Sequence, residues 1–110
     1  MDEIIQQLTD IGLVKNDAYI YCILLQFNSK TIMELSEIST LSRPSVYKII
    51  NSLLKAKLIF IDGSQKRPKY IAYQPDVIFN VLRQRQEQFF KLLPLLRNLS
   101  NVPRGTISGL

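Results

Sequence analysis

The basic side chains of this 110-residue sequence gather in its middle part. Residues 43–69 hold seven lysines and arginines but one acidic residue, Asp62. Residues 1–42 are acidic instead, with two basic and six acidic side chains, and the whole chain carries a net charge of +5. A positive segment in an otherwise acidic domain can neutralise nucleic-acid phosphates and release their counterions. It could also face an acidic protein or an anionic lipid, so charge alone leaves the partner open.

Most enzyme chemistry is excluded by the residue types that the sequence lacks. It has no histidine and one cysteine, Cys22, which excludes internal disulfides, histidine-ligated metals and nucleophiles that need a histidine base. The four glycines are too scattered for a phosphate-binding loop, and without histidine no acid–base constellation remains. We therefore expect no enzyme, no metal and no cofactor.

Length and composition indicate one soluble globular domain. The chain is 46% hydrophobic and 21% charged, which is ordinary for a folded protein. Its longest nearly uncharged apolar run, residues 18–27, is about half of the roughly 20 residues that a bilayer crossing needs. The first residues are acidic, unlike a secretory signal. We expect a cytoplasmic protein that does not enter a membrane.

Two helices are expected in the first 27 residues. Residues 2–11 carry apolar side chains at helical spacing, and Gly12 follows where a left-handed cap belongs. The run from about Asn16, which can cap a helix, to Phe27 is apolar on every side. That pattern is typical of a helix enclosed by other elements, where Cys22 is expected to be an inert small hydrophobe.

The next two expected helices form a helix-turn-helix pattern. Thr31 and Glu34 make a capping box for a short third helix. Ser42 is a suitable cap for a fourth helix, and Pro44 is tolerated in its first turn. The fourth helix has one apolar stripe and an opposite face that is polar and basic, as in a second helix that reads DNA.

A hairpin and a long helix are expected after the helix-turn-helix. Residues 58–61 and 70–73 are rich in β-branched and aromatic residues and flank a basic tip, which predicts a wing. The last helix is expected to start at Pro75 and Asp76 and to be bent or weakened near Pro94. It carries a heptad seam interrupted by one arginine, which predicts a coiled coil formed with a second copy. The seam consists of Ile78, Leu82, Arg85, Phe89, Leu92, Leu96 and Leu99.

A joint pattern of short motifs runs through residues 4–76. It comprises Ile11-Gly12-Leu13, Asp17-Ala18, Tyr21, Glu34-Leu35, Ile38-Ser39, Arg43-Pro44-Ser45-Val46-Tyr47, Leu53, Leu58-Ile59, Arg67-Pro68-Lys69-Tyr70 and Pro75. In these motifs the sequence resembles the amino-terminal winged helix-turn-helix domain of TrmB-type transcription regulators, which are mostly archaeal. The resemblance implies sequence-specific binding of double-stranded DNA by a homodimer, with the fourth helix in the major groove and the wing against the backbone. A DNA-binding protein of this type would be associated with the nucleoid.

The sequence departs from the family pattern at four points. Val14 stands where a hydroxyl usually caps the second helix, so that helix is expected to start at Asn16. Lys57 replaces the glycine that ends the fourth helix, at a cost of about 1 kcal/mol if the backbone stays left-handed. Asn28 stands near a usual loop glycine. Many members continue into a sugar-binding effector domain that is not present here, so the chain is either a short regulator or a fragment, and no small-molecule effector site is expected.

The candidate DNA contacts lie on the fourth helix and the wing. Arg43 is expected to read a guanine edge, because its fork can make a bidentate pair, while the wing is expected to hold backbone phosphates or to enter the minor groove. Tyr47 could donate to a phosphate or pack under the wing. The whole candidate set is Ser42, Arg43, Ser45, Tyr47, Lys48, Asn51, Ser52, Lys55, Lys66, Arg67 and Lys69.

These features predict an α+β, mostly α fold in three parts. They are a winged helix-turn-helix domain over residues 1–74, a dimerisation helix over 75–100 and a flexible tail over 101–110. The first hypothesis for function is a homodimeric, sequence-specific regulator of transcription. The alternatives are a chromatin-like architectural protein that coats DNA without an operator, and a winged-helix module whose basic face meets an acidic protein.

Overall fold

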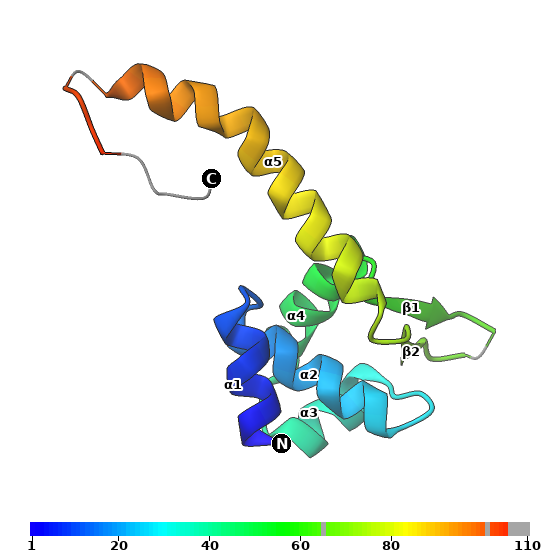
Figure 1. Ribbon diagram of the computed structural model, residues 1–110. Coiled ribbons are helices and arrows are strands. Elements are labelled where there is room, and N and C mark those ends of the chain that lie inside the picture. The colour runs from blue at the N-terminus through cyan, green and yellow to red at the C-terminus, as the bar shows by residue number, and fades with distance from the viewer. Residues whose placement is uncertain (65, 101, 106–110) are drawn as a thin grey trace. The chain divides into compact units, whose positions relative to one another are not determined.

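The computed structural model describes residues 1–64, 66–100 and 102–105. Its contacts divide the chain into two compact units, Met1–Ile78 and a second that begins at Phe79. The fold is mostly helical with one two-stranded sheet, which confirms the predicted fold class (Figure 1). The elements in chain order are α1 (Asp2–Asp10), α2 (Lys15–Gln26), α3 (Ile32–Ser39), α4 (Arg43–Lys55), β1 (Ile59–Asp62), β2 (Lys69–Ala72) and α5 (Val77–Leu99).

Helix α1 ends at a glycine in the left-handed conformation. Gly12 has a φ of 108°, a backbone conformation that residues with a Cβ rarely adopt. Its amide donates to the carbonyl of Thr9 at 2.9 Å, and the amide of Leu13 donates to the carbonyl of Leu8 at 3.0 Å. These two bonds are the Schellman pattern, which satisfies carbonyls at the end of the helix. The predicted glycine cap is thus confirmed.

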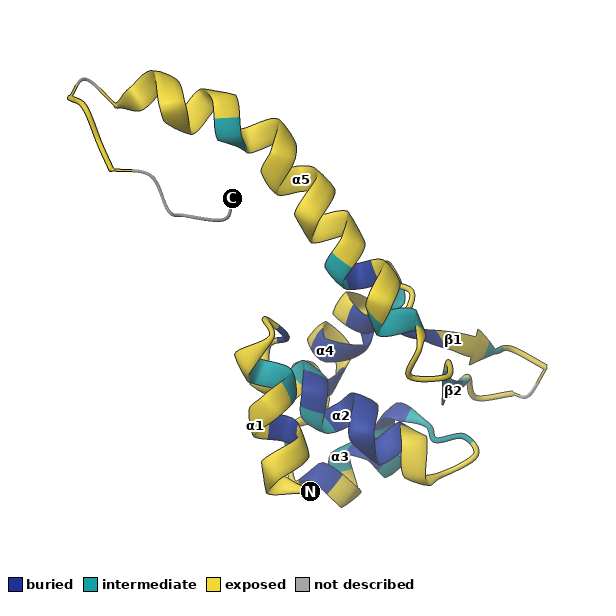
Figure 2. Cartoon of the chain, in the orientation of Figure 1, coloured by how far each residue is buried: buried dark blue, intermediate teal, exposed yellow. Residues whose placement is uncertain are grey.

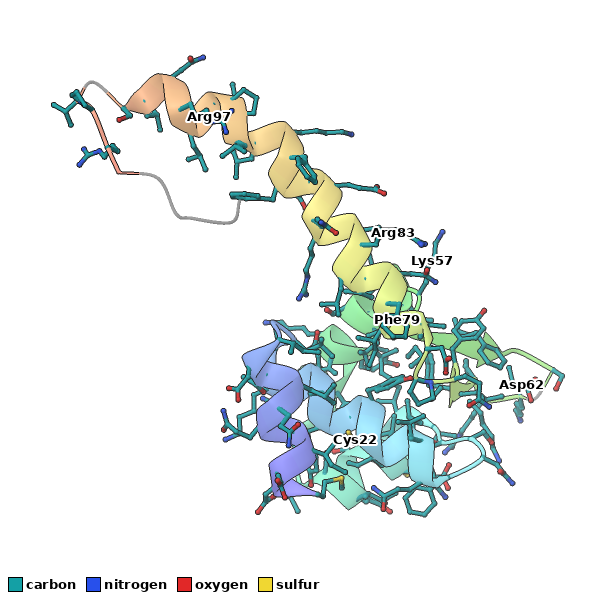
Figure 3. All side chains as sticks on the ribbon, in the orientation of Figure 1. Cys22, Lys57, Asp62, Phe79, Arg83 and Arg97 are labelled. Atoms are coloured by element: carbon teal, nitrogen blue, oxygen red, sulfur yellow. The ribbon has the colours of Figure 1, made fainter. Side chains whose placement is uncertain are left out.

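Helix α2 is the centre of the first unit. It packs against α1, α3, α4 and β2, and Figure 2 shows it as the most continuously buried helix. Cys22 lies on this helix and is buried (Figure 3), and burial raises the pKa of its thiol. The expected enclosed helix is therefore confirmed. Its buried side chains are Ala18, Ile20, Tyr21, Cys22, Ile23 and Leu24.

The start of α2 differs from the expected one. The helix begins at Lys15, and Val14 occupies the N-cap position without a side-chain hydrogen bond. The carbonyl of Val14 accepts the amide of Ala18 at 2.9 Å, which starts the helical pattern before Asn16 is reached. The expected cap at Asn16 is wrong, because burial of the following apolar residues holds this helix end without one.

The helix-turn-helix consists of α3 and α4, and both predicted caps are present. The Thr31 amide donates to Glu34 Oε1 at 3.0 Å, and the Glu34 amide donates to Thr31 Oγ1 at 3.2 Å. The Ser42 hydroxyl oxygen accepts the amide of Ser45 at 3.3 Å at the start of α4. Such caps satisfy amides that the first helical turn leaves without a backbone partner.

Strands β1 and β2 form the predicted antiparallel wing, with Ile59 opposite Ala72 and Asp62 opposite Lys69. Both strands lie one residue nearer to the tip than expected. At the base of the hairpin, β1 starts late because the Leu58 amide donates to the carbonyl of Leu53 and closes the end of α4. The strand therefore starts only after Leu58.

A backbone bridge that the sequence did not predict joins the wing to the helices. Lys30, in the connection between α2 and α3, donates its amide to the carbonyl of Tyr70 at 3.2 Å. In return its carbonyl accepts the amide of Tyr70 at 2.8 Å. Strand β2 is therefore fixed on both sides, by β1 and by this bridge.

Helix α5 starts two residues later than predicted, at Val77, because Gln74 and Pro75 supply the carbonyls of a preceding turn. It contains Pro94 and bends in its second half (Figure 1), as expected where proline removes a backbone hydrogen bond. No helix among the described residues is long and apolar enough to cross a membrane. Of the predicted tail, residues 102–105 form no regular element, and 101 and 106–110 lie outside the described residues.

Candidate nucleic-acid interface

Helix α4 has a buried face and a polar face, as its sequence predicted. The buried side packs towards α2, α3 and β1 and consists of Val46, Ile49, Ile50 and Leu53. The opposite side is exposed and carries the cationic and polar groups that could reach a polyanion. It consists of Arg43, Ser45, Tyr47, Lys48, Asn51, Ser52 and Lys55.

The first turn of α4 is ordered by two serines. Ser42 Oγ donates to Ser45 Oγ at 2.9 Å in addition to accepting the Ser45 amide. The hydroxyl of Ser42 is thus used to cap the helix, while the hydroxyl hydrogen of Ser45 remains able to donate outward. Arg43 lies between them, at the first helical position.

One candidate on α4 is engaged within the fold. Ser52 Oγ donates to Asp17 Oδ2 on α2 at 2.6 Å. A carboxylate at this place disfavours an incoming phosphate, because like charges repel. The contact of Ser52 with DNA remains a prediction, and Asp17 sets an acidic boundary on the C-terminal half of the α4 surface.

The wing carries its basic residues after a turn ordered by Asp62, which Figure 3 labels on the hairpin. Ser64 donates to Asp62 Oδ1 through its amide at 3.1 Å and its hydroxyl at 2.7 Å. These hydrogen bonds lower the pKa of Asp62, and the charge of Lys69 adds to the effect. Lys66 and Arg67 are exposed, and Lys69 is half-buried.

Arg43 of α4 and Arg67 of the wing line one surface hollow of about 310 Å³. The hollow therefore joins the start of α4 to the wing, as the predicted binding surface requires. Lys48, Lys55 and Lys66 do not line it. Its lining consists of Thr31, Ile32, Met33, Arg43, Tyr47, Arg67, Pro68 and Tyr70.

Two tyrosines of different character belong to this hollow. Tyr47 is 55% exposed, whereas Tyr70 is buried, and burial raises the pKa of Tyr70, with a smaller effect from the Tyr47 hydroxyl. Tyr47 thus lies at the hollow, where its ring remains largely exposed. The sequence missed the part played by Tyr70 and by the first turn of α3, since no local pattern shows that Lys30 pairs with β2 and brings these residues together.

The predicted seam residues lie along α5. Ile78 and Leu82 are half-buried, and the remaining members, Arg85, Phe89, Leu92, Leu96 and Leu99, are exposed in the single chain. Exposed leucine and phenylalanine side chains on one helix are typical of an association surface.

No group of three or more potential metal ligands occurs in the described part of the chain.

A helix-turn-helix followed directly by a basic hairpin defines the winged-helix class, which is found in many DNA-binding regulators. Comparison with known families agrees with this class. The family model described as "Sugar-specific transcriptional regulator TrmB" matches residues 8–76, which is more than half of the sequence. The chain belongs to the TrmB family, a family of transcriptional regulators and not of enzymes. No curated protein matches the sequence.

Several solved structures share the fold. TrmBL2, described as an archaeal chromatin protein with a novel mode of DNA binding, is 24% identical with a TM-score of 0.76. The match covers 89% of this chain and 38% of TrmBL2, so the chain spans well under half of that protein. MarR of Staphylococcus aureus, solved with salicylate and kanamycin, is 18% identical with a TM-score of 0.55, covering 88% of this chain and 65% of MarR. BpsR of Bordetella bronchiseptica is 18% identical with a TM-score of 0.56, covering 92% and 85%.

Proposed function

We propose that the chain is a transcription regulator that binds specific double-stranded DNA sequences as a homodimer. The observation that carries this proposal is the hollow that an arginine of α4 and an arginine of the wing both line within one unit. Membership of a family of transcriptional regulators supports it.

In this mechanism α4 enters the major groove and the wing lies against the backbone. Lys48 and Asn51 are exposed on α4, three residues apart, and so lie on one side of the helix. Lysine can donate to guanine, and asparagine can pair with adenine in a bidentate manner. These two side chains are the base-reading candidates, while Lys55, Lys66 and Lys69 are suited to phosphates.

The dimer places two such units on one DNA site. Pairing of two α5 helices along the heptad seam would cover the exposed apolar side chains of that seam, such as Phe89, Leu92 and Leu96. Two α4 helices related by two-fold symmetry would then enter successive major grooves about one helical turn apart. The expected binding site is therefore a two-fold symmetric pair of half-sites.

Selection of bound sequences from random duplexes tests the proposal. We expect one palindromic sequence to be enriched and its binding to weaken steeply with salt, by a slope of about 0.9 per phosphate contacted. Lys48→Ala should relax the preference at one base pair of each half-site, whereas Lys55→Ala should weaken all sequences alike. If no sequence is enriched and binding is negligible at moderate salt, the chain is a protein-interaction module and the proposal is wrong.

A second candidate is a chromatin-like architectural role, favoured by the likeness to TrmBL2. It uses the same α4 and wing surface on DNA of any sequence. The selection separates the two, because an architectural protein would bind and coat every duplex with similar affinity.

A further inference from the structure

The hollow between α4 and the wing has the chemistry of an anion site. Two arginines from separate elements, Arg43 and Arg67, line it, and no acidic residue of the described chain is among its lining residues. Arginine forks match the oxygen geometry of a phosphate. The phenol of Tyr47 adds a further hydrogen-bond donor on the same hollow.

The backbone holds these groups in place before any ligand arrives. Arg43 is fixed at the first turn of α4, which the Ser42 cap orders. Arg67 precedes Pro68, and a residue before proline is restricted to extended backbone. Tyr70, three residues further on, is held by the paired hydrogen bonds with Lys30. A site prepared in this way loses less conformational freedom when it binds.

Two acidic groups on the elements beside the hollow, Glu34 of α3 and Asp62 of β1, already have partners within the fold. The Glu34 carboxylate accepts the Thr31 amide and lies 3.7 Å from Lys30 Nζ, and the amide hydrogen bond lowers its pKa. The Asp62 carboxylate accepts two hydrogen bonds from Ser64. The charge directly at the hollow is therefore that of the two arginines.

We propose that this hollow seats one backbone phosphate of the bound DNA, and that Arg43 and Arg67 hold that same phosphate together. This inference rests on the proposed function and assigns roles within it. Arg43 becomes a positioning residue that sets the depth and register of α4 in the groove, in place of the guanine reader expected from the sequence. Base reading then belongs to residues further along α4, such as Lys48.

A double-mutant cycle on the selected duplex tests whether Arg43 and Arg67 hold the same phosphate. We expect Arg43→Ala and Arg67→Ala each to weaken binding about tenfold or more, the range for a hydrogen bond to a charged group. The double variant should lose clearly less than the product of the two losses, because both side chains serve one phosphate. The base preference should stay unchanged in both variants. Lys66→Ala is the matched control, an exposed wing cation that does not line the hollow, and its loss should multiply with that of Arg43→Ala.

Duplexes with a single neutral methylphosphonate identify the phosphate. At one position of each half-site, the neutral linkage should abolish the loss of affinity caused by Arg43→Ala and also that caused by Arg67→Ala. The loss of affinity caused by Lys66→Ala should remain. Multiplicative losses, two different sensitive positions, or a changed base preference in Arg43→Ala would overturn the shared site while leaving the proposed function intact. If the wild-type chain binds no duplex, the proposed function and the shared site are both wrong. Circular dichroism of each variant confirms that the exposed substitutions leave the fold unchanged.

Discussion

Lys57 holds a backbone conformation that glycine adopts more easily. Its φ is 60°, and it follows the end of α4 at the place where Gly12 follows the end of α1. The same pair of hydrogen bonds closes both helices, since the Lys57 amide donates to Leu54 and the Leu58 amide donates to Leu53, each at 3.0 Å. The sequence departure at Lys57 therefore leaves the helix end unchanged and places strain on one residue.

Lys57→Gly should raise the free energy of unfolding by up to about 1 kcal/mol. Relief of the left-handed strain favours glycine, and the larger freedom of glycine in the unfolded chain offsets part of the gain. Urea unfolding at neutral pH measures the change. Lys57→Ala is the control, because it removes the same charge and keeps the Cβ, so a gain of equal size in that variant would refute the explanation by strain.

At the scale of elements, the features that the sequence predicts correctly depend on neighbouring residues. The capping box of Thr31 and Glu34 and the glycine cap at Gly12 follow from groups a few residues apart, so their chemistry can be recognised without a structure. The bridge of Lys30 to Tyr70 joins residues 40 positions apart through backbone groups, which every residue has. No side-chain pattern could therefore have predicted it.

The same distinction between local and long-range contacts explains which parts of the candidate interface could be predicted. Arg43, Tyr47 and Arg67 could be predicted because charge, helical face and wing position all follow from local sequence. The partnership of Ser52 with Asp17 could not, since two helices bring these residues together across 35 positions. Tertiary contacts therefore decide which polar groups on a predicted binding face remain available.

One part-buried hydrogen bond joins α2 to the segment that follows the wing. Tyr21 is fully buried, and its hydroxyl donates to the carbonyl of Tyr73 at 2.8 Å. Tyr21→Phe should lower the free energy of unfolding by about 1 kcal/mol, because the hydrogen bond to the Tyr73 carbonyl is lost. Tyr19→Phe, on the same helix, is the control and should have a smaller effect. Denaturant unfolding of both variants at pH 7 measures the difference.

The stability that Tyr21 contributes over phenylalanine should decrease at alkaline pH. Burial raises the pKa of Tyr21 from about 10 to about 12, because the neutral phenol is favoured inside the folded unit. The stabilisation is therefore complete below pH 10 and declines as the pH rises towards 12, where the unfolded chain is already ionised. Unfolding titrations of wild type and Tyr21→Phe over this window should converge, and a constant difference would contradict this linkage.

At the scale of the whole molecule, α5 is the least covered element of the described chain (Figure 2). Phe89 is 51% exposed and Phe90 is 64% exposed. The heptad pattern distinguishes these neighbours, since Phe89 lies in the seam with Leu92 and Leu96 while Phe90 lies on the outer side of the helix. Exposure alone would give Phe90 the greater role, so the two residues test whether the heptad seam or simple apolarity governs association.

Phe89→Asp should convert the proposed dimer into a monomer, whereas Phe90→Asp should leave it paired. A buried carboxylate in the seam loses its hydration without gaining a partner, while one on the outer side stays in water. Sedimentation equilibrium measures the mass of each variant, and circular dichroism checks that the helices persist. Separate half-site readers lose the effective concentration that the dimer provides, so binding of the palindromic duplex should weaken on the order of 10²–10⁴-fold in Phe89→Asp alone. A dimeric Phe89→Asp, or equal dissociation by Phe90→Asp, would show that two chains do not meet along this seam.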